Sequence, residues 1–211
     1  MLAMVEEAGC KVDRKKARIY FPRKLVEEMV AQAPAEFILY SRDGKRDLSE
    51  MLPLVEDLGL RAIEEIPTSL SGEDDVDDLF SHDFGVLGFD GRRLDLAACG
   101  ARVAAALTAT LMGESESDGL SRLLVLTDLD HERINILRAY RSYWHLVNPA
   151  FSKPYFASAF AAHPDIAGDL VRLFESRFGP EPDAEVEQAL RASLVGRLDA
   201  VAAARHLGVG P

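Results

Sequence analysis

The chain has 211 residues, of which 24 are basic and 35 acidic, so its formal net charge is −11. Such an acidic chain lacks the basic surface with which a general nucleic-acid binder neutralises phosphates. Hydrophobic residues make up 48% of the sequence, enough for a packed core, yet no apolar run reaches the roughly 20 residues that span a bilayer. Two cysteines, Cys10 and Cys99, are too few for a disulfide framework or a cysteine-rich metal site. We expect a globular cytoplasmic protein that binds neither nucleic acid nor a membrane.

Charge is unevenly distributed along the chain. Residues 1–46 hold ten basic and seven acidic residues, a net charge of +3, whereas residues 47–211 hold 14 and 28, a net charge of −14. The hydrophobic pattern changes at about the same place. This asymmetry indicates two segments with different surroundings.

Up to residue 93 the sequence alternates between helical and strand patterns. One predicted helix has Ser49 as its N-cap and ends at Gly59. Five acids in residues 73–78 predict a solvated loop over 68–78. The other expected elements are a helix over 2–8, a strand over 17–21, a helix between Pro22 and Pro34, and strands over 36–41, 60–66 and 80–89. This order predicts a small α/β sandwich with helices on one sheet face.

From Leu94 onward the pattern is helical. Thr127 or Asp128 is expected to cap one helix, and two prolines separate the last two helices. Helices are predicted over 94–112, 118–126, 130–147, 153–162, 164–178 and 183–207. The fold class is therefore α+β, a small α/β sandwich followed by an all-helical segment. The expected domains are an N-terminal helix–strand–helix segment, an α/β module and a helical segment, over residues 1–35, 36–112 and 113–211.

No motif identifies a catalytic centre. His82 and Asp83 are the residue types of a general-base pair, but adjacent strand residues point to opposite faces, which favours a polar strand start or a turn cap. Ser115 and Ser117 lack the glycine-flanked elbow of a hydrolase nucleophile, and Ser117 or Asp118 is expected to cap a helix. The histidines do not have the spacing of metal ligands. We assign no catalytic, cofactor-binding or metal-binding residue.

Three further features have ordinary structural explanations. Cys99 is expected to be a small buried core residue. Arg133, Arg138 and Arg141 share one predicted helix and are expected on its exposed face, with anion binding as the alternative. A dense group of aromatic residues is expected to pack between two antiparallel helices, with a ligand pocket as the alternative. The group consists of Tyr140, Tyr143, Trp144, Phe151, Tyr155, Phe156 and Phe160.

Several short sequences resemble the large bacterial NAD-dependent glutamate dehydrogenases. Residues 48–61 (LSEMLPLVEDLGLR) are similar to their LS-x-x-LP-x-LE-x-LGLR run, and residues 82–85 (HDFG) to the HDF-G that follows it. Residues 116–123 (ESDGLSRL) resemble their E-x-D-x-x-NRL motif, with Ser121 in place of the usual Asn. Further similarities follow in the same order at residues 136–140, 151–155, 163–167 and 173–178. The resemblance covers about residues 36–198.

The resemblance implies a regulatory α/β module of the ACT type followed by a helical region, both lying before the family's catalytic domain. The family's glutamate pocket and nucleotide-binding domain are not recognised in this sequence, so no catalytic residue is carried over and the chain is expected to be inactive alone. The parent family oxidatively deaminates glutamate to 2-oxoglutarate with NAD, and no cofactor is expected in this chain. Expected partners are the rest of the parent dehydrogenase or its subunits and an amino-acid effector.

The basic N-terminal segment carries a second resemblance. Stretches within residues 1–43, including IYFPRKLVEE at 19–28, are similar to the N-terminal region of the trimethylamine methyltransferase family, whose members are corrinoid-dependent barrel enzymes. The barrel itself has no counterpart after Asp47. A methyltransferase remnant and a small ligand-binding or protein-interaction module therefore remain alternatives. If a downstream domain is missing, exposed apolar surface should cause self-association.

Overall fold

The computed structural model describes residues 6–14, 16, 18–32, 35–41, 45–70 and 79–206. The chain forms two compact units. The first consists of residues 1–45 and 61–94, and the second of residues 46–60 and 95–211. Within the described ranges, no helix is both long and apolar enough to cross a membrane.

The first unit begins with a small antiparallel hairpin. Strand β1 (Lys11–Asp13) pairs with β2 (Arg18–Tyr20), and Val12 lies opposite Ile19. Strand β2 was predicted, whereas β1 was not, because three residues with a single apolar side chain carry no periodic signal. Helix α2 (Arg23–Gln32) follows, within the predicted interval.

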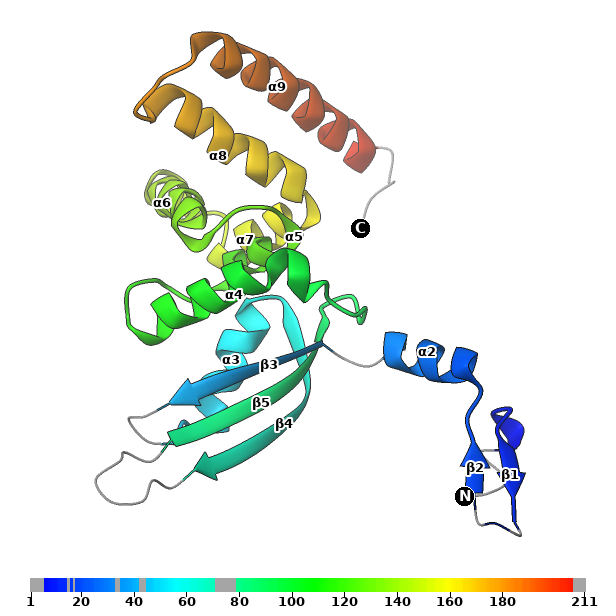
Figure 1. Ribbon diagram of the computed structural model, residues 1–211. Helices are drawn as coiled ribbons and strands as arrows, with labels where there is room; N and C mark the ends of the chain where they lie inside the picture. The colour runs from blue at the N-terminus through cyan, green and yellow to red at the C-terminus, as the bar shows by residue number, and fades with distance from the viewer. Residues whose placement is uncertain are drawn as a thin grey trace. The chain divides into compact units, whose positions relative to one another are not determined.

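A three-stranded sheet forms the rest of the first unit. Its strands are β3 (Ala35–Ser41), β4 (Leu60–Leu70) and β5 (Leu79–Gly88), in the order β3-β5-β4. The central strand β5 runs opposite to both neighbours (Figure 1). Phe37 lies opposite Phe84 and their rings stack at 5.3 Å between centroids. Burial alternates along β3, so that Phe37 and Leu39 are half-buried whereas Ile38 and Tyr40 are exposed.

One boundary in this sheet differs from the prediction. The loop expected over 68–78 starts later, because β4 extends to Leu70 and its last residues, including the β-branched Thr68, fit a strand. The rest of the predicted acidic loop, residues 71–78, lies outside the described residues, as does most of the predicted helix over 2–8.

The second unit is helical. Its elements are α3 (Leu48–Asp57), α4 (Leu96–Leu111), the 3-10 helix η1 (Gly119–Arg122), α5 (Leu123–Leu126), α6 (His131–Val147), α7 (Lys153–Ala162), α8 (Pro164–Phe178) and α9 (Ala184–His206). Helices α8 and α9 lie side by side (Figure 1). The strand–helix–strand–strand–helix order of β3 to α4, followed by helices alone up to residue 206, where the description ends, confirms the α+β class.

Helix boundaries in this unit follow from capping groups. The carboxylate of Asp95 accepts hydrogen bonds from the backbone N–H groups of Ala97 and Ala98 at the start of α4, and Asp130 does the same for Arg133 in α6. The prediction that Thr127 or Asp128 caps this helix is therefore wrong, because Asp130 is the N-cap of α6. The predicted cap Ser49 is wrong, because α3 already begins at Leu48.

Gly59 has a φ of +75° and terminates the α3 region, as predicted.

The core of the helical unit is made of aliphatic side chains from several helices. Fully buried residues of this unit include Met51, Val55, Leu120, Leu123, Leu124, Ile134, Leu137 and Val171.

Candidate functional site

Two arginines of α6 lie inside the helical unit. Arg138 is 6% exposed and Arg141 is 3% exposed, so the prediction of an exposed arginine face is wrong for both. They lie on the same helical stripe as the buried Ile134 and Leu137, at spacings of three and four residues. Arg133 differs, since it is exposed, as predicted, and forms an ion pair with Glu175 at 2.8 Å.

Asp118 is the counterion that makes this burial tolerable. One of its oxygens accepts a hydrogen bond from Arg138 Nε at 3.2 Å, and the other accepts a short hydrogen bond from Arg141 Nη1. The carboxylate also accepts the backbone N–H of Leu120 at 3.0 Å and so caps η1, as predicted for Ser117 or Asp118. Without these bonds, Arg138 would have no carboxylate partner among the described residues, and Arg141 would keep only the longer ion pair with Glu116 at 3.7 Å.

Neutral side chains complete the coordination of Arg138. Its Nη1 donates to Asn135 at 2.7 Å and to Ser115 at 3.4 Å, and its Nη2 donates to Ser121 at 2.8 Å. Ser121, which is 5% exposed, occupies the position where the resembling motif carries Asn. A hydroxyl oxygen accepts this bond, and an amide oxygen is an acceptor of the same kind.

The charges around Asp118 stabilise its ionised form. Burial acts to raise the pKa of this carboxyl, but the hydrogen bond from Arg141 and the charges of Arg138 and Arg141 outweigh it, and the pKa is held below its ordinary value. Asp118 is therefore ionised at neutral pH. A carboxylate in this state is a partner for cations and a poor proton donor.

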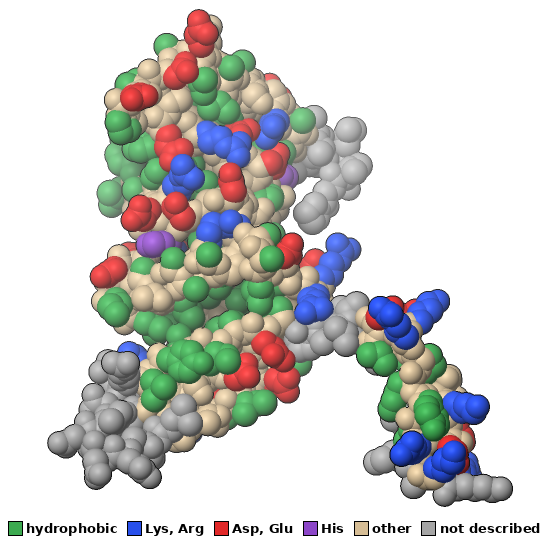
Figure 2. Space-filling view, in the orientation of Figure 1, with side chains coloured by type: hydrophobic (Ala, Val, Ile, Leu, Met, Phe, Trp, Pro, Cys, Tyr) green, Lys and Arg blue, Asp and Glu red, His purple; other side chains and the backbone are tan. Residues whose placement is uncertain are grey.

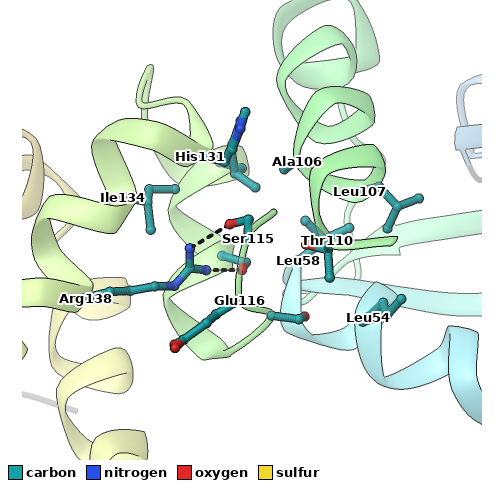
Figure 3. A pocket seen from close by; sticks show the side chains of 13 residues that line it. Leu54, Leu58, Ala106, Leu107, Thr110, Ser115, Glu116, His131, Ile134 and Arg138 are labelled. Atoms are coloured by element: carbon teal, nitrogen blue, oxygen red, sulfur yellow. Dashed lines mark hydrogen bonds between the residues drawn. The ribbon is translucent and has the colours of Figure 1, made fainter. Parts of the chain in front are cut away.

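A small cavity adjoins the cluster (Figure 3). Its volume is about 10 Å³ and its lining includes Leu54, Leu107, Ser115, His131 and Arg138. That space suits roughly one water molecule. The cavity is therefore too small for an amino acid or a nucleotide.

Another residue of the resembling motif region also makes an internal contact. The hydroxyl of Ser117 donates to the Asp57 carboxylate at 2.9 Å and connects the segment that precedes η1 to the end of α3. Together with Asp118 and Ser121, Ser117 directs its polar atoms to other groups of the same unit. The motif thus builds an internal network.

The sheet unit holds a separate buried polar pair. His82, which is 1% exposed, contacts Glu65 through Nδ1 at 2.8 Å, with Glu65 on β4 and His82 inside β5. The prediction that His82 starts a strand or caps a turn is wrong, whereas its separation from Asp83 follows from strand alternation as expected. Among the described residues, His82 Nε2 has no hydrogen-bond partner. The partner Glu65 was missed because strand pairing sets it 17 residues away in sequence.

Cys99 lies in the core, as predicted. It is 4% exposed, and its thiol donates to the backbone oxygen of Asp95 at 3.3 Å. Burial raises the pKa of this thiol, so Cys99 remains protonated and unreactive at neutral pH.

The predicted aromatic packing is wrong for most of its members. Phe151 and Tyr155 stack at 5.2 Å between centroids, but both are exposed, because the second half of α6 and the start of α7 lie on the surface. We call this exposed set the α6 surface. It comprises Tyr140, Tyr143, Trp144, Leu146, Val147, Phe151 and Tyr155, which are 41–84% exposed.

Two apolar grooves are associated with this part of the unit. One, of about 460 Å³, is lined by α6 residues that include Ile136 and Tyr143, together with Phe174 of α8. The other, of about 550 Å³, is lined by apolar residues of α6, α7 and α8, with Arg177 and Arg191 among its few charged groups. Exposed apolar surface of this extent is typical of an interaction site.

Comparisons with known proteins identify the family. A family model described as the glutamate dehydrogenase ACT3 domain matches residues 16–99, and one described as glutamate dehydrogenase helical motif 3 matches residues 115–180. The first match begins at residue 16, inside the segment for which a methyltransferase resemblance was the alternative interpretation.

Three similar proteins are each named NAD-specific glutamate dehydrogenase. The protein of Pseudomonas aeruginosa is 33% identical over 169 residues, covering 77% of this chain and 10% of that protein. The protein of Halomonas elongata is 32% identical over 142 residues, covering 67% and 9%, and that of Mycobacterium tuberculosis is 28% identical over 188 residues, covering 84% and 12%. The chain thus spans about a tenth of the length of these relatives. It belongs to the large NAD-dependent glutamate dehydrogenase family, as a segment that corresponds to the ACT3 domain and helical motif 3.

Proposed function

We propose that this chain is a non-catalytic, structural and regulatory region of a large NAD-dependent glutamate dehydrogenase. In this proposal the parent enzyme oxidatively deaminates glutamate with NAD in the cytoplasm, and an amino acid acts on the ACT-like module as an effector. The chain's own role is to fold into a rigid part that supports the catalytic domain.

One observation carries the proposal. One of the motifs that resemble the family, residues 116–123, places Asp118 and Ser121 on the buried arginines of α6. A catalytic motif has to direct its polar groups at a substrate, whereas here they hold two helical segments together. The adjacent cavity of about 10 Å³ admits no substrate of the size of glutamate.

The α6 surface supplies the contact with the rest of the enzyme. Its side chains are apolar and aromatic, the composition that is enriched in the centre of protein interfaces. In this proposal the α6 surface is covered by another part of the parent dehydrogenase. The three relatives are each about ten times as long as the segment that matches this chain, so they contain further parts that could cover it.

The test uses the full-length dehydrogenase that contains this segment. Asp118→Asn removes the charge at the cluster, and Asp128→Asn, at a carboxylate that is 71% exposed, is the matched control. We expect Asp118→Asn to shorten the half-life of activity at raised temperature while kcat and the KM for glutamate and NAD remain unchanged. A fall in kcat at a temperature where the variant is fully folded would contradict the proposal.

A further inference from the structure

The larger of the two apolar grooves lies among four helices. It has a volume of about 550 Å³ and is lined from α6, α7, α8 and α9, whereas the groove of about 460 Å³ is lined by α6 and a single residue of α8. Figure 2 shows hydrophobic side chains exposed over α6 and the adjacent end of α8. We call the larger groove the Arg191 groove; its apolar lining includes Leu137, Tyr140, Phe160, Leu173, Phe174 and Phe178. A mostly apolar groove of about 300–1,000 Å³ is typical of a small-molecule site.

Aromatic rings form a continuous strip along the Arg191 groove. Tyr140 meets Phe174 edge to face at 6.0 Å between ring centroids, and the ring of Phe174 lies 5.1 Å from that of Phe178. The strip runs from α6 to the C-terminal end of α8. A hydrocarbon chain that lies on this strip is removed from water, which is favourable for each CH₂ group.

One cation of the groove has no counterion. Arg177 pairs with Glu187 at 3.5 Å, and Glu187 is the one carboxylate among the described lining residues. Arg191 lies on an exposed part of α9 and has no ion-pair partner within the described part of the chain. Its guanidinium group is therefore available to a carboxylate from a ligand.

The charge of the rest of the chain makes this cation selective. Residues 47–211 have a net charge of −14, so most of this surface repels anions. The groove itself has two arginines and one glutamate, a net charge of +1. An apolar strip in the same groove as an unpaired guanidinium is complementary to a ligand with a hydrocarbon chain and a terminal carboxylate.

A peptide helix matches the Arg191 groove less well than a hydrocarbon chain does. A helix with its side chains is about 10–12 Å across and packs into a furrow along a helix surface, which is the form of the groove of about 460 Å³ on α6. The Arg191 groove is bordered by four helices, which favours a narrower ligand. We propose that the Arg191 groove binds a free fatty acid, with the acyl chain on the aromatic strip and the carboxylate at Arg191. This site is additional to the proposed function and does not depend on it.

The test is isothermal titration calorimetry with dodecanoate, below the concentration at which it forms micelles. It uses the purified chain and the full-length dehydrogenase that contains this segment. We expect one molecule to bind per chain in both, with an affinity that rises about fourfold for each CH₂ group from octanoate to dodecanoate. Arg191→Gln should weaken dodecanoate binding about tenfold, because a hydrogen bond between charged groups is lost. Lys153→Gln, at an exposed cation of α7 outside the groove, is the matched control and should leave the affinity unchanged.

A second pair of variants tests the apolar strip. Phe178→Glu places a negative charge on the strip, at a side chain that is 61% exposed, and should abolish binding of dodecanoate. Leu146→Glu, at a side chain outside the groove that is 84% exposed, is the matched control and should bind as the wild type does. Because both sites are exposed, both variants should fold, which circular dichroism verifies.

Four results would overturn the proposal. They are a chain that shows no saturable binding, an affinity that does not change with chain length, a variant of either pair that binds dodecanoate as tightly as its control, and binding to the chain but not to the dehydrogenase. The last would show that a segment of the parent enzyme fills the groove, and it would leave the proposed function intact. The thermal inactivation test of Asp118→Asn depends on none of these titrations, so failure of one proposal is distinguishable from failure of the other.

Discussion

Replacing Asp118 by Asn should destabilise the helical unit severely. The variant keeps the size of the side chain and an oxygen for the N–H of Leu120, but it removes the one charge that faces both Arg138 and Arg141. The Arg141 side chain is 2% exposed and the Arg138 side chain 7%, so neither gains compensating hydration.

The magnitude follows from these contacts. Removing one partner from a buried ion pair costs about 3–5 kcal/mol, and the 23% exposure of the Asp118 side chain reduces this to about 3 kcal/mol. For a chain of this length, such a loss lowers Tm by about 6–12 °C.

The assay is urea unfolding of the purified chain, followed by circular dichroism of its helices. Asp128→Asn is the control, because its ion pair with Arg172 is long and exposed and is worth about 0–1 kcal/mol. If the two variants unfold at the same urea concentration, the buried cluster does not hold the unit together and the reasoning is refuted.

Three further changes have defined consequences. Folding lowers the pKa of Asp118, so the stabilisation by its charge is present above the ordinary pKa of 3.8 and is lost as the pH falls through the lowered value. The difference in unfolding free energy between wild type and Asp118→Asn, measured with urea, should therefore shrink only in strong acid. Leu120→Ala, at a fully buried site, should lower the unfolding free energy by about 3 kcal/mol in the same assay, whereas Leu146→Ala, at a site 84% exposed, should lower it by about 0.5 kcal/mol or less. Equal losses of unfolding free energy would contradict the assigned core. Gly59→Ala should lower thermal stability by about 1–2 kcal/mol, since φ is +75° and the new methyl group would lie 3.0 Å from Arg122 Cγ; an unchanged Tm would contradict that geometry.

The helical part of the fold was predictable because its signals are local. Apolar spacing and the punctuation by proline and glycine placed α6, α7 and α8 within one residue of their observed bounds. Strand β5 was predicted equally well from its run of apolar and aromatic residues. These elements are determined by a period in the sequence and need no information from distant residues.

The candidate site was predictable only in part. Asp118 was expected to cap a helix, and it does, but its second role depends on arginines 20 and 23 residues away in sequence. One local signal was available, since Arg138 and Arg141 share the helical stripe of Ile134 and Leu137 and so were bound to face the core. The contact between His82 and Glu65 depends on strand pairing, which a single sequence does not specify.

The exposure of the aromatic residues of α6 was not predictable, because periodicity shows that a helix has an apolar face and does not show what covers it. Leu146 and Val147 extend the apolar positions of α6 around a second side of the helix, opposite the stripe that contains Ile134. A helix that is apolar on two sides has two partners or one large one. In the proposed function the second partner is the remainder of the dehydrogenase.

The most direct test of the central claim is an activity measurement on the 211-residue chain itself. The purified, folded chain is incubated with glutamate and NAD, and NADH formation is followed by absorbance. The account predicts no glutamate-dependent NADH from the wild type or from Asp118→Asn, although the two differ in stability. Glutamate-dependent turnover by the wild-type chain that Asp118→Asn abolishes would contradict it.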